Sequence, residues 1–354
     1  MTATPAPFAA KLALLGTSGG THIGGSFVRG AAKLGIESIY FDTQKAWAGP
    51  SLLRSLCWHL ADRRPLYLNH FSNELVKACA GAKPEILIAT GMAPLTASGL
   101  RALRQLGIVS VNYSTDDPWN PAMRSNWYLQ ALPLYDLIFT PRRSNLADFQ
   151  GLGCPRVQYL PFGYDETLFA SPVQSGDTHA HDVLFVGGAD ADRAAFMAEF
   201  MRHGPPVAVA GGYWKRYPAF RAYALGKKPP EVIRALTAAA KVSLCLVRRA
   251  NRDGHVMRSF EIAAAGGCML AQDTDEHREI FGPEGEAVAY FRDAKEAAQR
   301  ACVLVCDSSE RKRLAAGLHR CIVGGAHTYA HRLGTMLGIA RGTRALRMGP
   351  VTPC

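Results

Sequence analysis

Short apolar runs alternate with segments of helical periodicity along most of the chain, and this alternation predicts an α/β protein with parallel sheets. The runs are rich in Val, Ile and Leu, as strands buried on both faces are. In the first half the predicted strands are 11–15, 36–41, 85–90, 108–113, 136–140 and 157–161. In the second half they are 182–186, 207–210, 242–247, 268–271 and 287–291.

The intervals between strands carry helical periodicity, so each half reads as a doubly wound, Rossmann-like domain. The predicted helices are 27–35, 99–106, 144–152, 193–203, 231–240, 256–265, 275–281, 295–306, 309–323 and 327–337. Residues 170–181 are polar and broken by Pro172 and Gly176, which indicates a linker. We therefore expect a first domain over 1–169, a second over 182–325, and a final segment, 326–354, that contains the last helix.

Composition agrees with two globular domains. The chain has 354 residues, of which 48% are hydrophobic and 19% charged, so it can bury a large core. Its nine cysteines are scattered without a C-x-x-C pair, which favours reduced thiols. No apolar run approaches membrane-spanning length, and Leu12 to Leu15 leads into a Gly-rich loop rather than a cleavage site. We expect a cytoplasmic protein.

The formal net charge of +11 is spread along the chain. A diffuse basic excess suits an anionic small ligand or peripheral attraction to an anionic membrane. No nucleic-acid reader motif is present, so nucleic acid is not an expected partner. The sequence also lacks G-x-S-x-G, H-E-x-x-H and zinc-type cysteine patterns, and we expect neither a metal nor a cofactor.

The stretch from Leu246 to Phe281 carries the strongest signal for a site. A predicted strand rich in β-branched residues is followed by the charged loop 248–255. A helix then begins near Val256 and ends at Gly266-Gly267. The helix N-terminus then lies at the carboxyl end of a parallel strand, where such sheets bind ligands and where unpaired N–H groups favour phosphate.

Two side chains near this helix start have matching chemistry. Arg258 offers a forked phosphate contact, and Glu261, three residues on, shares its face of the helix. A carboxylate there would accept hydrogen bonds from two neighbouring hydroxyls, such as a ribose diol. The alternative is an Arg–Glu pair on a solvated helix face, and residue chemistry alone leaves both open.

The segments N-R-D-G-H-V-M-R-S-F-E-I-A-A-A-G-G and D-T-D-E-H-R-E-I-F-G-P resemble the nucleotide-sugar segment of CgeB-type, spore-maturation-like glycosyltransferases. These enzymes have the GT-B fold, with two Rossmann-like domains facing across a cleft and a C-terminal helix crossing back to the first. The resemblance implies that Glu261 binds the donor ribose. Asp253 stands eight positions earlier, where many retaining members carry Glu, and it is one methylene shorter.

Other residues of the second half are expected donor contacts on the same grounds. Asn251 and His255 would approach the donor sugar, and the loops after the first two strands of the domain would border the nucleotide. Arg193 or Lys215 could reach a phosphate there, or either could be a surface charge. The remaining predicted donor-side residues are the glycines Gly187, Gly188 and Gly266.

The first half offers a Gly-rich loop, G-T-S-G-G-T-H-I-G-G-S, after its first strand. Its spacing is neither that of a dinucleotide fingerprint nor that of a P-loop. In GT-B enzymes the corresponding loop faces the acceptor, which implies an acceptor-side role for Gly19 and Gly20. His22 is the most attractive general base in this half because imidazole titrates near neutral pH. A structural loop histidine is the alternative.

The sequence S-T-D-D-P-W places Asp116 and Asp117 at the carboxyl end of another strand. CgeB-type relatives often carry D-D-P here, so both aspartates are catalytic candidates. The alternative is an Asx turn that caps the next helix. Trp119 would either stack on an acceptor sugar or pack in the interior.

These expectations describe a metal-independent, hexosyltransferase-like glycosyltransferase that uses a nucleotide-diphosphate sugar and an unidentified acceptor: a glycan, a lipid-linked sugar, a protein or a small molecule. Asp253 favours retention of configuration, whereas inversion would require His22 or an aspartate as base. The alternatives are a GT-B nucleotide-sugar epimerase and a non-catalytic protein that binds a sugar nucleotide or glycan.

Overall fold

The computed structural model describes residues 11–169 and 180–348, which divide into two compact units. The first unit comprises 11–161, 250–252 and 329–348; the second comprises 162–169, 180–249 and 253–328. Most of the predicted linker, 170–179, lies outside the described residues. Residues 162–169, expected in the first domain, pack with the second unit, and the short loop 250–252 packs with the first.

The first unit is built on a parallel six-stranded sheet with the order β2-β1-β3-β4-β5-β6. Its strands are β1 (Leu12–Gly16), β2 (Ser38–Asp42), β3 (Ile86–Thr90), β4 (Val109–Tyr113), β5 (Leu137–Thr140) and β6 (Val157–Tyr159). The sequence prediction of a parallel α/β sheet is therefore confirmed. Every residue of β1, β4 and β5 is buried, which explains why these strands read as unbroken apolar runs.

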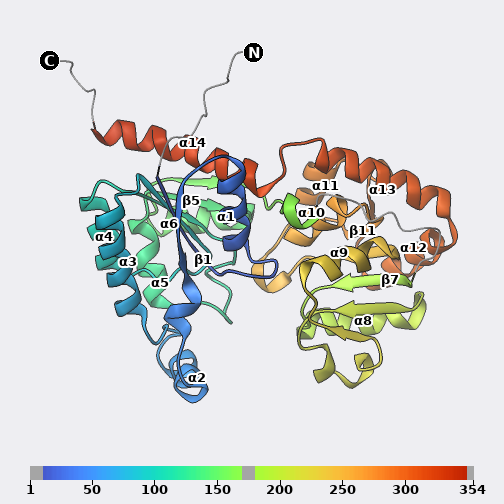
Figure 1. The fold of residues 1–354 in the computed structure, drawn as a ribbon. Coiled ribbons are helices and arrows are strands. Elements are labelled where there is room, and N and C mark those ends of the chain that lie inside the picture. Colours follow the sequence, from blue (N-terminus) through green and yellow to red (C-terminus); the bar gives the residue numbers. More distant parts are fainter. Residues whose placement is uncertain (1–10, 170–179, 349–354) are drawn as a thin grey trace, which may run out of the picture. The chain divides into compact units, whose positions relative to one another are not determined.

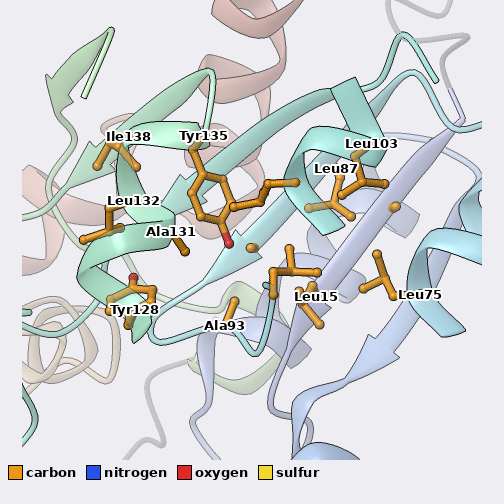
Figure 2. Close-up of a cluster of buried hydrophobic side chains, with 14 of the residues drawn as sticks. Leu15, Leu75, Leu87, Ala93, Leu103, Tyr128, Ala131, Leu132, Tyr135 and Ile138 are labelled. Carbon is orange, nitrogen blue, oxygen red and sulfur yellow. The ribbon is translucent and has the colours of Figure 1, made fainter. Parts of the chain in front are cut away.

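Figure 1 shows the helices of the first unit, which lie against its sheet except for α2, which stands apart from it. They are α1 (Ile23–Lys33), α2 (Ser51–Leu60), α3 (Leu68–Ala82), α4 (Ala97–Gln105), α5 (Asn126–Ala131), α6 (Leu146–Gly151) and α14 (Tyr329–Met348), with the 3-10 turns η1 (Thr43–Trp47), η2 (Leu132–Leu134) and η3 (Arg143–Asn145). Figure 2 shows one core of this unit, where Leu75 of α3 and Leu103 of α4 meet Leu15 and Leu87 of the sheet. The sequence analysis had not predicted α2 or α3.

The last helix, α14, packs against α1 at a glycine. A Cβ added at Gly30 would lie 3.2 Å from Cα of Ala330, so the two backbones approach more closely than a side chain allows. Phe27 and Tyr329 flank the contact edge to face, with ring centroids 5.7 Å apart. The helix predicted over 327–337 continues to Met348 because no Pro interrupts it.

The second unit has its own parallel six-stranded sheet, in the order β12-β11-β10-β7-β8-β9. Its strands are β7 (His181–Val186), β8 (Val207–Ala210), β9 (Ala224–Gly226), β10 (Ala240–Cys245), β11 (Met269–Gln272) and β12 (Ala289–Phe291). Numbered within the unit, this is the strand order of a Rossmann domain. The sequence analysis missed β9, whose three residues are too few to form an apolar run.

Several helices of the second unit begin at polar caps. The helices of this unit are α7 (Glu166–Phe169), α8 (Ala191–His203), α9 (Pro230–Ala238), α10 (Met257–Ala264), α11 (Asp275–Phe281), α12 (Ala294–Cys306) and α13 (Ser308–Val323), with the 3-10 turns η4 (Trp214–Arg216), η5 (Pro218–Phe220) and η6 (Arg249–Asn251), the last of which runs into the loop 250–252. The side chains of Asp190 and Thr274 accept hydrogen bonds from the first turns of α8 and α11. At the end of α10, Gly266 takes a φ of +76°, as the Gly-Gly exit predicted.

The strand order of each sheet defines where a ligand binds. In open parallel sheets, ligands bind beyond the carboxyl ends of the strands, where the order of strands reverses. In the second unit this point lies between β7 and β10, and in the first between β1 and β3. The loops that follow these strands carry most of the candidate residues.

No helix in the described parts of the chain is long and apolar enough to cross a membrane.

The contact of α1 with α14 gives a stability test. We expect Gly30→Leu to lower the free energy of unfolding by about 2 kcal/mol or more, because the side chain must push two helix backbones apart. Gly338→Ala on α14, where an added Cβ meets nothing within 4 Å, should instead stabilise the protein by about 0.5–1 kcal/mol. Urea unfolding of both variants measures this, and equal effects would contradict the close contact.

Candidate functional site

The start of α10 lies at the carboxyl end of β10, at the strand-order reversal of the second unit. Val256 precedes the helix in an extended conformation. The first N–H groups of a helix have no acceptor within it and carry the positive end of its dipole. This edge of the sheet therefore presents hydrogen-bond donors suited to an anion.

Arg258 and Glu261 form an ion pair through Nη1 and Oε2, one turn into α10. The predicted alternative of a solvated pair is wrong, because the Glu261 side chain is only 3% exposed and that of Arg258 only 16%. Their contact lies outside hydrogen-bonding geometry: among the described residues, Glu261 Oε2, Arg258 Nε and Arg258 Nη1 are buried without a hydrogen-bond partner. Unsatisfied buried polar atoms are costly, so this pair is suited to accept a polar ligand.

Burial raises the pKa of Glu261 to about 7. The guanidinium of Arg258 opposes this shift, and the nearby carboxylate of Asp165 adds to it. A strongly perturbed carboxyl at the ligand-binding edge of a sheet is typical of a functional site rather than a surface ion pair.

A buried hydrogen-bond chain fixes the helix start. Ser259 Oγ lies 2.9 Å from His277 Nε2, and His277 Nδ1 lies 2.7 Å from the carbonyl oxygen of Gln272. Since only an N–H can satisfy that carbonyl, Nδ1 donates and Nε2 accepts from the serine hydroxyl. Burial lowers the pKa of His277 to about 4, which keeps the ring neutral. The first turn of α10 is thus bonded to α11.

His255 is held by two hydrogen bonds within the second unit, and its contact with a donor sugar stays a prediction. It is fully buried, its Nδ1 lies 2.6 Å from Glu276 Oε2, and its Nε2 accepts from the backbone N–H of Phe162 at 3.0 Å. Both ring nitrogens are therefore engaged. Gly254 makes room for this pair, because a Cβ there would lie 2.5 Å from Cδ of Glu276.

Basic and acidic side chains also lie at this edge of the second unit's sheet, beyond the carboxyl ends of its strands. Arg193, at the start of α8, is half-buried and donates to the carbonyl of Gly188 at 3.2 Å. Burial lowers the pKa of its guanidinium, with Asp190 opposing, Arg248 adding and Asp253 opposing. Asp253 is half-buried. These side chains therefore belong to one electrostatic cluster on the second unit.

A cavity of about 200 Å³ opens within this cluster. It is bounded by the start of α8, the residues after β10 and the end of β11. Its lining includes Asp190, Arg193, Phe196, Leu246, Arg248 and Gln272. Apolar walls with a few charged groups are typical of small-molecule sites.

The predicted donor-side loops differ in their suitability. The carbonyls of Gly187 and Gly188 face inward, accepting from Trp214 Nε1 at 2.8 Å and from Arg193. A Cβ at Gly211 would lie 2.1 Å from the Gly187 oxygen, so the two loops touch backbone to backbone. Lys215 is exposed. The structure thus favours Arg193 over Lys215 as the cation at this edge.

In the first unit the Gly-rich loop joins β1 to α1. Gly19 and Gly20 adopt φ values of +83° and +52°, and a Cβ on either would meet no atom within 4 Å. Gly16 and Gly24 are required by internal packing instead, since a Cβ on Gly24 would lie 2.7 Å from the Thr17 carbonyl oxygen. His22 is exposed at the start of α1, where its side chain makes no capping hydrogen bond.

Asp117 is part of the framework rather than a free acid. Its Oδ1 accepts from the Trp119 backbone N–H at 3.0 Å, which is the Asx turn that the sequence analysis left open. The same carboxylate also accepts from Asn145 Nδ2 at 2.9 Å and from Arg252 Nε at 2.6 Å. A buried carboxylate with this many donors does not suit the predicted catalytic role.

Asp116 and Asn251 meet within the first unit. Asn251 is buried, accepts from Asn120 Nδ2 at 2.7 Å and lies with Nδ2 3.5 Å from Asp116 Oδ1. A hydrogen bond between two side-chain amides thus holds Asn251, and its contact with a donor sugar stays a prediction. Asp116 is half-buried. Trp119 packs edge to face on Phe149, with centroids 5.0 Å apart, as its structural alternative predicted.

Comparison with known proteins identifies the class of fold. Residues 193–338 match the family described as glycosyl transferase-like. No curated protein matches the chain in sequence.

Several solved structures are similar over nearly the whole chain. HepE from Anabaena, in complex with UDP and glucose, is 12% identical, with a TM-score of 0.62 over 94% of this chain and 100% of that one. Sucrose-phosphate synthase from Thermosynechococcus elongatus is 13% identical, with a TM-score of 0.67 over 94% and 99%. T4 phage BGT, with its UDP-glucose substrate, is 12% identical, with a TM-score of 0.58 over 93% and 99%. The chain therefore has the GT-B fold of glycosyltransferases.

Some residues of the site were not predicted from the sequence. Asp165 adds to the raised pKa of Glu261, and Glu276 and His277 support the helix start. The run T-D-E-H contains the last two, after the helix-capping Thr274. The available signal was this polar run itself, which closely follows the predicted strand 268–271.

The raised pKa of Glu261 predicts a dependence of stability on pH. Between about pH 4.5 and the folded pKa of about 7, the folded state holds a proton that the unfolded state has lost, so stability falls as pH rises through this window. Relative to Glu261→Gln, the ligand-free protein should lose up to about 3 kcal/mol between about pH 5 and pH 8.

Urea unfolding across this range measures the difference. Glu310→Gln is the matched control, because Glu310 also pairs with an arginine three positions away, but its side chain is 34% exposed and Arg313 lowers its pKa. The control should show no such trend over the same range. A parallel pH dependence of the protein and Glu261→Gln would contradict the burial argument.

Proposed function

We propose that this protein is a glycosyltransferase that moves a sugar from a nucleotide-diphosphate sugar to an acceptor. The observation that carries the proposal is the buried Arg258–Glu261 pair, with three unsatisfied polar atoms, at the ligand-binding edge of a Rossmann-type sheet. The glycosyl transferase-like match over 193–338 covers this pair. The similarity to GT-B structures solved with UDP or UDP-glucose supports the same class of donor.

Glu261 is assigned to the ribose of the donor. Its carboxylate lies four residues after Met257, where α10 begins, so a diphosphate bound at the helix start would leave the adjoining ribose beside it. Two vicinal hydroxyls donating to this carboxylate would replace the missing hydrogen bonds of Oε2. They would also stabilise the ionised form of a group whose pKa burial has raised.

The diphosphate is assigned to Arg258, Arg193 and the N-terminus of α10. As the glycosidic bond breaks, negative charge develops on the leaving diphosphate, and fixed positive groups stabilise that charge. Ser259 and His277 hold the start of α10 in place, so the N–H groups that would bind the diphosphate need not reorganise during the reaction. The proposal therefore assigns the leaving-group charge to protein groups rather than to a metal.

Three residues remain as proposed catalytic groups. Asp253 belongs to the electrostatic cluster around Arg193 and is assigned to the donor sugar. His22 and Asp116 lie at the carboxyl edge of the first unit's sheet, where we place the acceptor. Gly19 and Gly20, with open space beside them, fit an acceptor-side turn.

The donor assignment is tested by binding. The full chain is titrated with UDP-, GDP- and dTDP-glucose by calorimetry, and slow donor hydrolysis is followed in parallel. We expect Glu261→Ala to lower the affinity for the sugar nucleotide by roughly tenfold to a hundredfold, because the substitution removes hydrogen bonds from the ribose to a charged carboxylate. Glu310→Ala, which breaks the exposed Glu–Arg pair of α13, should leave affinity unchanged.

A 2′-deoxy form of the best-bound nucleotide sharpens this test. The unmodified protein should prefer the ribose form, and Glu261→Ala should lose that preference. If no nucleotide sugar binds, or if Glu261→Ala binds as tightly as the unmodified protein, the assignment is wrong. A changed sugar still attached to its nucleotide, formed without acceptor, would show an epimerase instead.

A further inference from the structure

Helix α2 belongs to the first unit but does not pack into its core. None of its ten residues is buried, and Figure 1 shows it standing off the rest of its unit. Leu52 and Leu60 are 72% and 79% exposed, and Leu53 and Leu56 are 45% and 44% exposed. Ordinary surface helices bury their apolar face, whereas no residue within 11–169 or 180–348 covers the apolar face of this helix.

The four leucines lie on one side of α2. Their positions 52, 53, 56 and 60 span about 100° around a helix of 3.6 residues per turn. Trp58 points the other way and meets Trp47 of η1, with ring centroids 5.7 Å apart. The leucine stripe therefore faces away from the contact that attaches the helix.

The chain leaving α2 is held rigidly. Arg63 donates to three backbone carbonyls of the segment 121–124, at 2.7–3.0 Å. Asp62 Oδ2 accepts from the backbone N–H groups of Asn126 and Trp127 at 2.6 and 3.2 Å. Both residues adopt φ of +54°, a conformation unfavourable for non-glycine residues. Such anchoring presents α2 in a fixed position instead of letting it collapse onto the sheet.

The surroundings of the stripe are basic. Arg54 lies on α2, and Arg63 and Arg64 follow it. The single acid between residues 48 and 67 is Asp62, whose carboxylate is bonded to the start of α5. Arg54 itself lies on the far side of α2 from the leucines, about 150° from the centre of the stripe. This region carries three arginines and one acid, so an anionic bilayer attracts it, and an exposed apolar stripe suits the bilayer interface. A second copy of the chain is disfavoured, because two such regions carry the same net positive charge.

We propose that α2 inserts its leucine stripe into the headgroup region of a membrane that contains anionic phospholipid, to which the basic residues around the stripe attract the protein. The inference is independent of the donor site. It gives a fixed location to the peripheral membrane attraction that the net charge of +11 only suggested.

The test is sedimentation of the full chain with vesicles of phosphatidylcholine, with or without phosphatidylglycerol. The protein should bind the anionic vesicles, and binding should weaken as ionic strength rises. Replacing Leu52, Leu56 and Leu60 together by Ser should reduce the affinity by roughly a hundredfold or more. The triple variant should keep its unfolding midpoint, because these side chains contribute no buried contact.

Two further variants separate the causes. Serine at Leu106, Val303 and Val323, which are exposed apolar residues outside α2, should leave vesicle binding unchanged. Arg54→Glu should weaken binding to anionic vesicles and reduce its salt dependence. Failure to bind anionic vesicles, or equal binding by the triple variant, would overturn the proposal. Self-association that the triple variant abolishes would assign the stripe to a second copy instead.

Discussion

The second unit is organised around a carboxylate held out of water. Glu261 is buried next to Arg258, and burying a charged group is expensive unless its partners are well placed. Here the pair lacks hydrogen-bonding geometry, yet the elements around it are firmly bonded. Ser259 and His277 fix the helix start, and His255 with Glu276 fixes the loop before it. The framework thus holds an unsatisfied pair ready for a ligand.

In the first unit, the two adjacent acids Asp116 and Asp117 have different surroundings. Asp117 is surrounded by donors from its own turn, from Asn145 and from Arg252, so its charge is satisfied within the fold. Adjacent Asp116 is half-buried and has one long contact, with Asn251. Two neighbouring aspartates of identical chemistry therefore have different surroundings, because the turn after β4 places Asp117 among hydrogen-bond donors and leaves Asp116 half-buried.

Helix α2 shows that local pattern and tertiary packing can disagree. Its leucines sit on one face, as in any amphipathic helix that covers a core, but the structure leaves that face uncovered. The anchored turn at Asp62 and Arg63 explains how an unpacked helix is held. Periodicity identifies an apolar face without identifying what covers it.

The sequence by itself determined the parallel α/β architecture and the position of α10, because apolar runs, the Gly266 exit and strand spacing are local properties. It also singled out Arg258 and Glu261 as a pair, since residues three apart share a helix face. Only the tertiary structure decided that this pair is buried and that His255 and Asp117 are engaged elsewhere. Burial and hydrogen-bond partners depend on residues distant in sequence, such as Phe162 and Arg252, which no local pattern reveals.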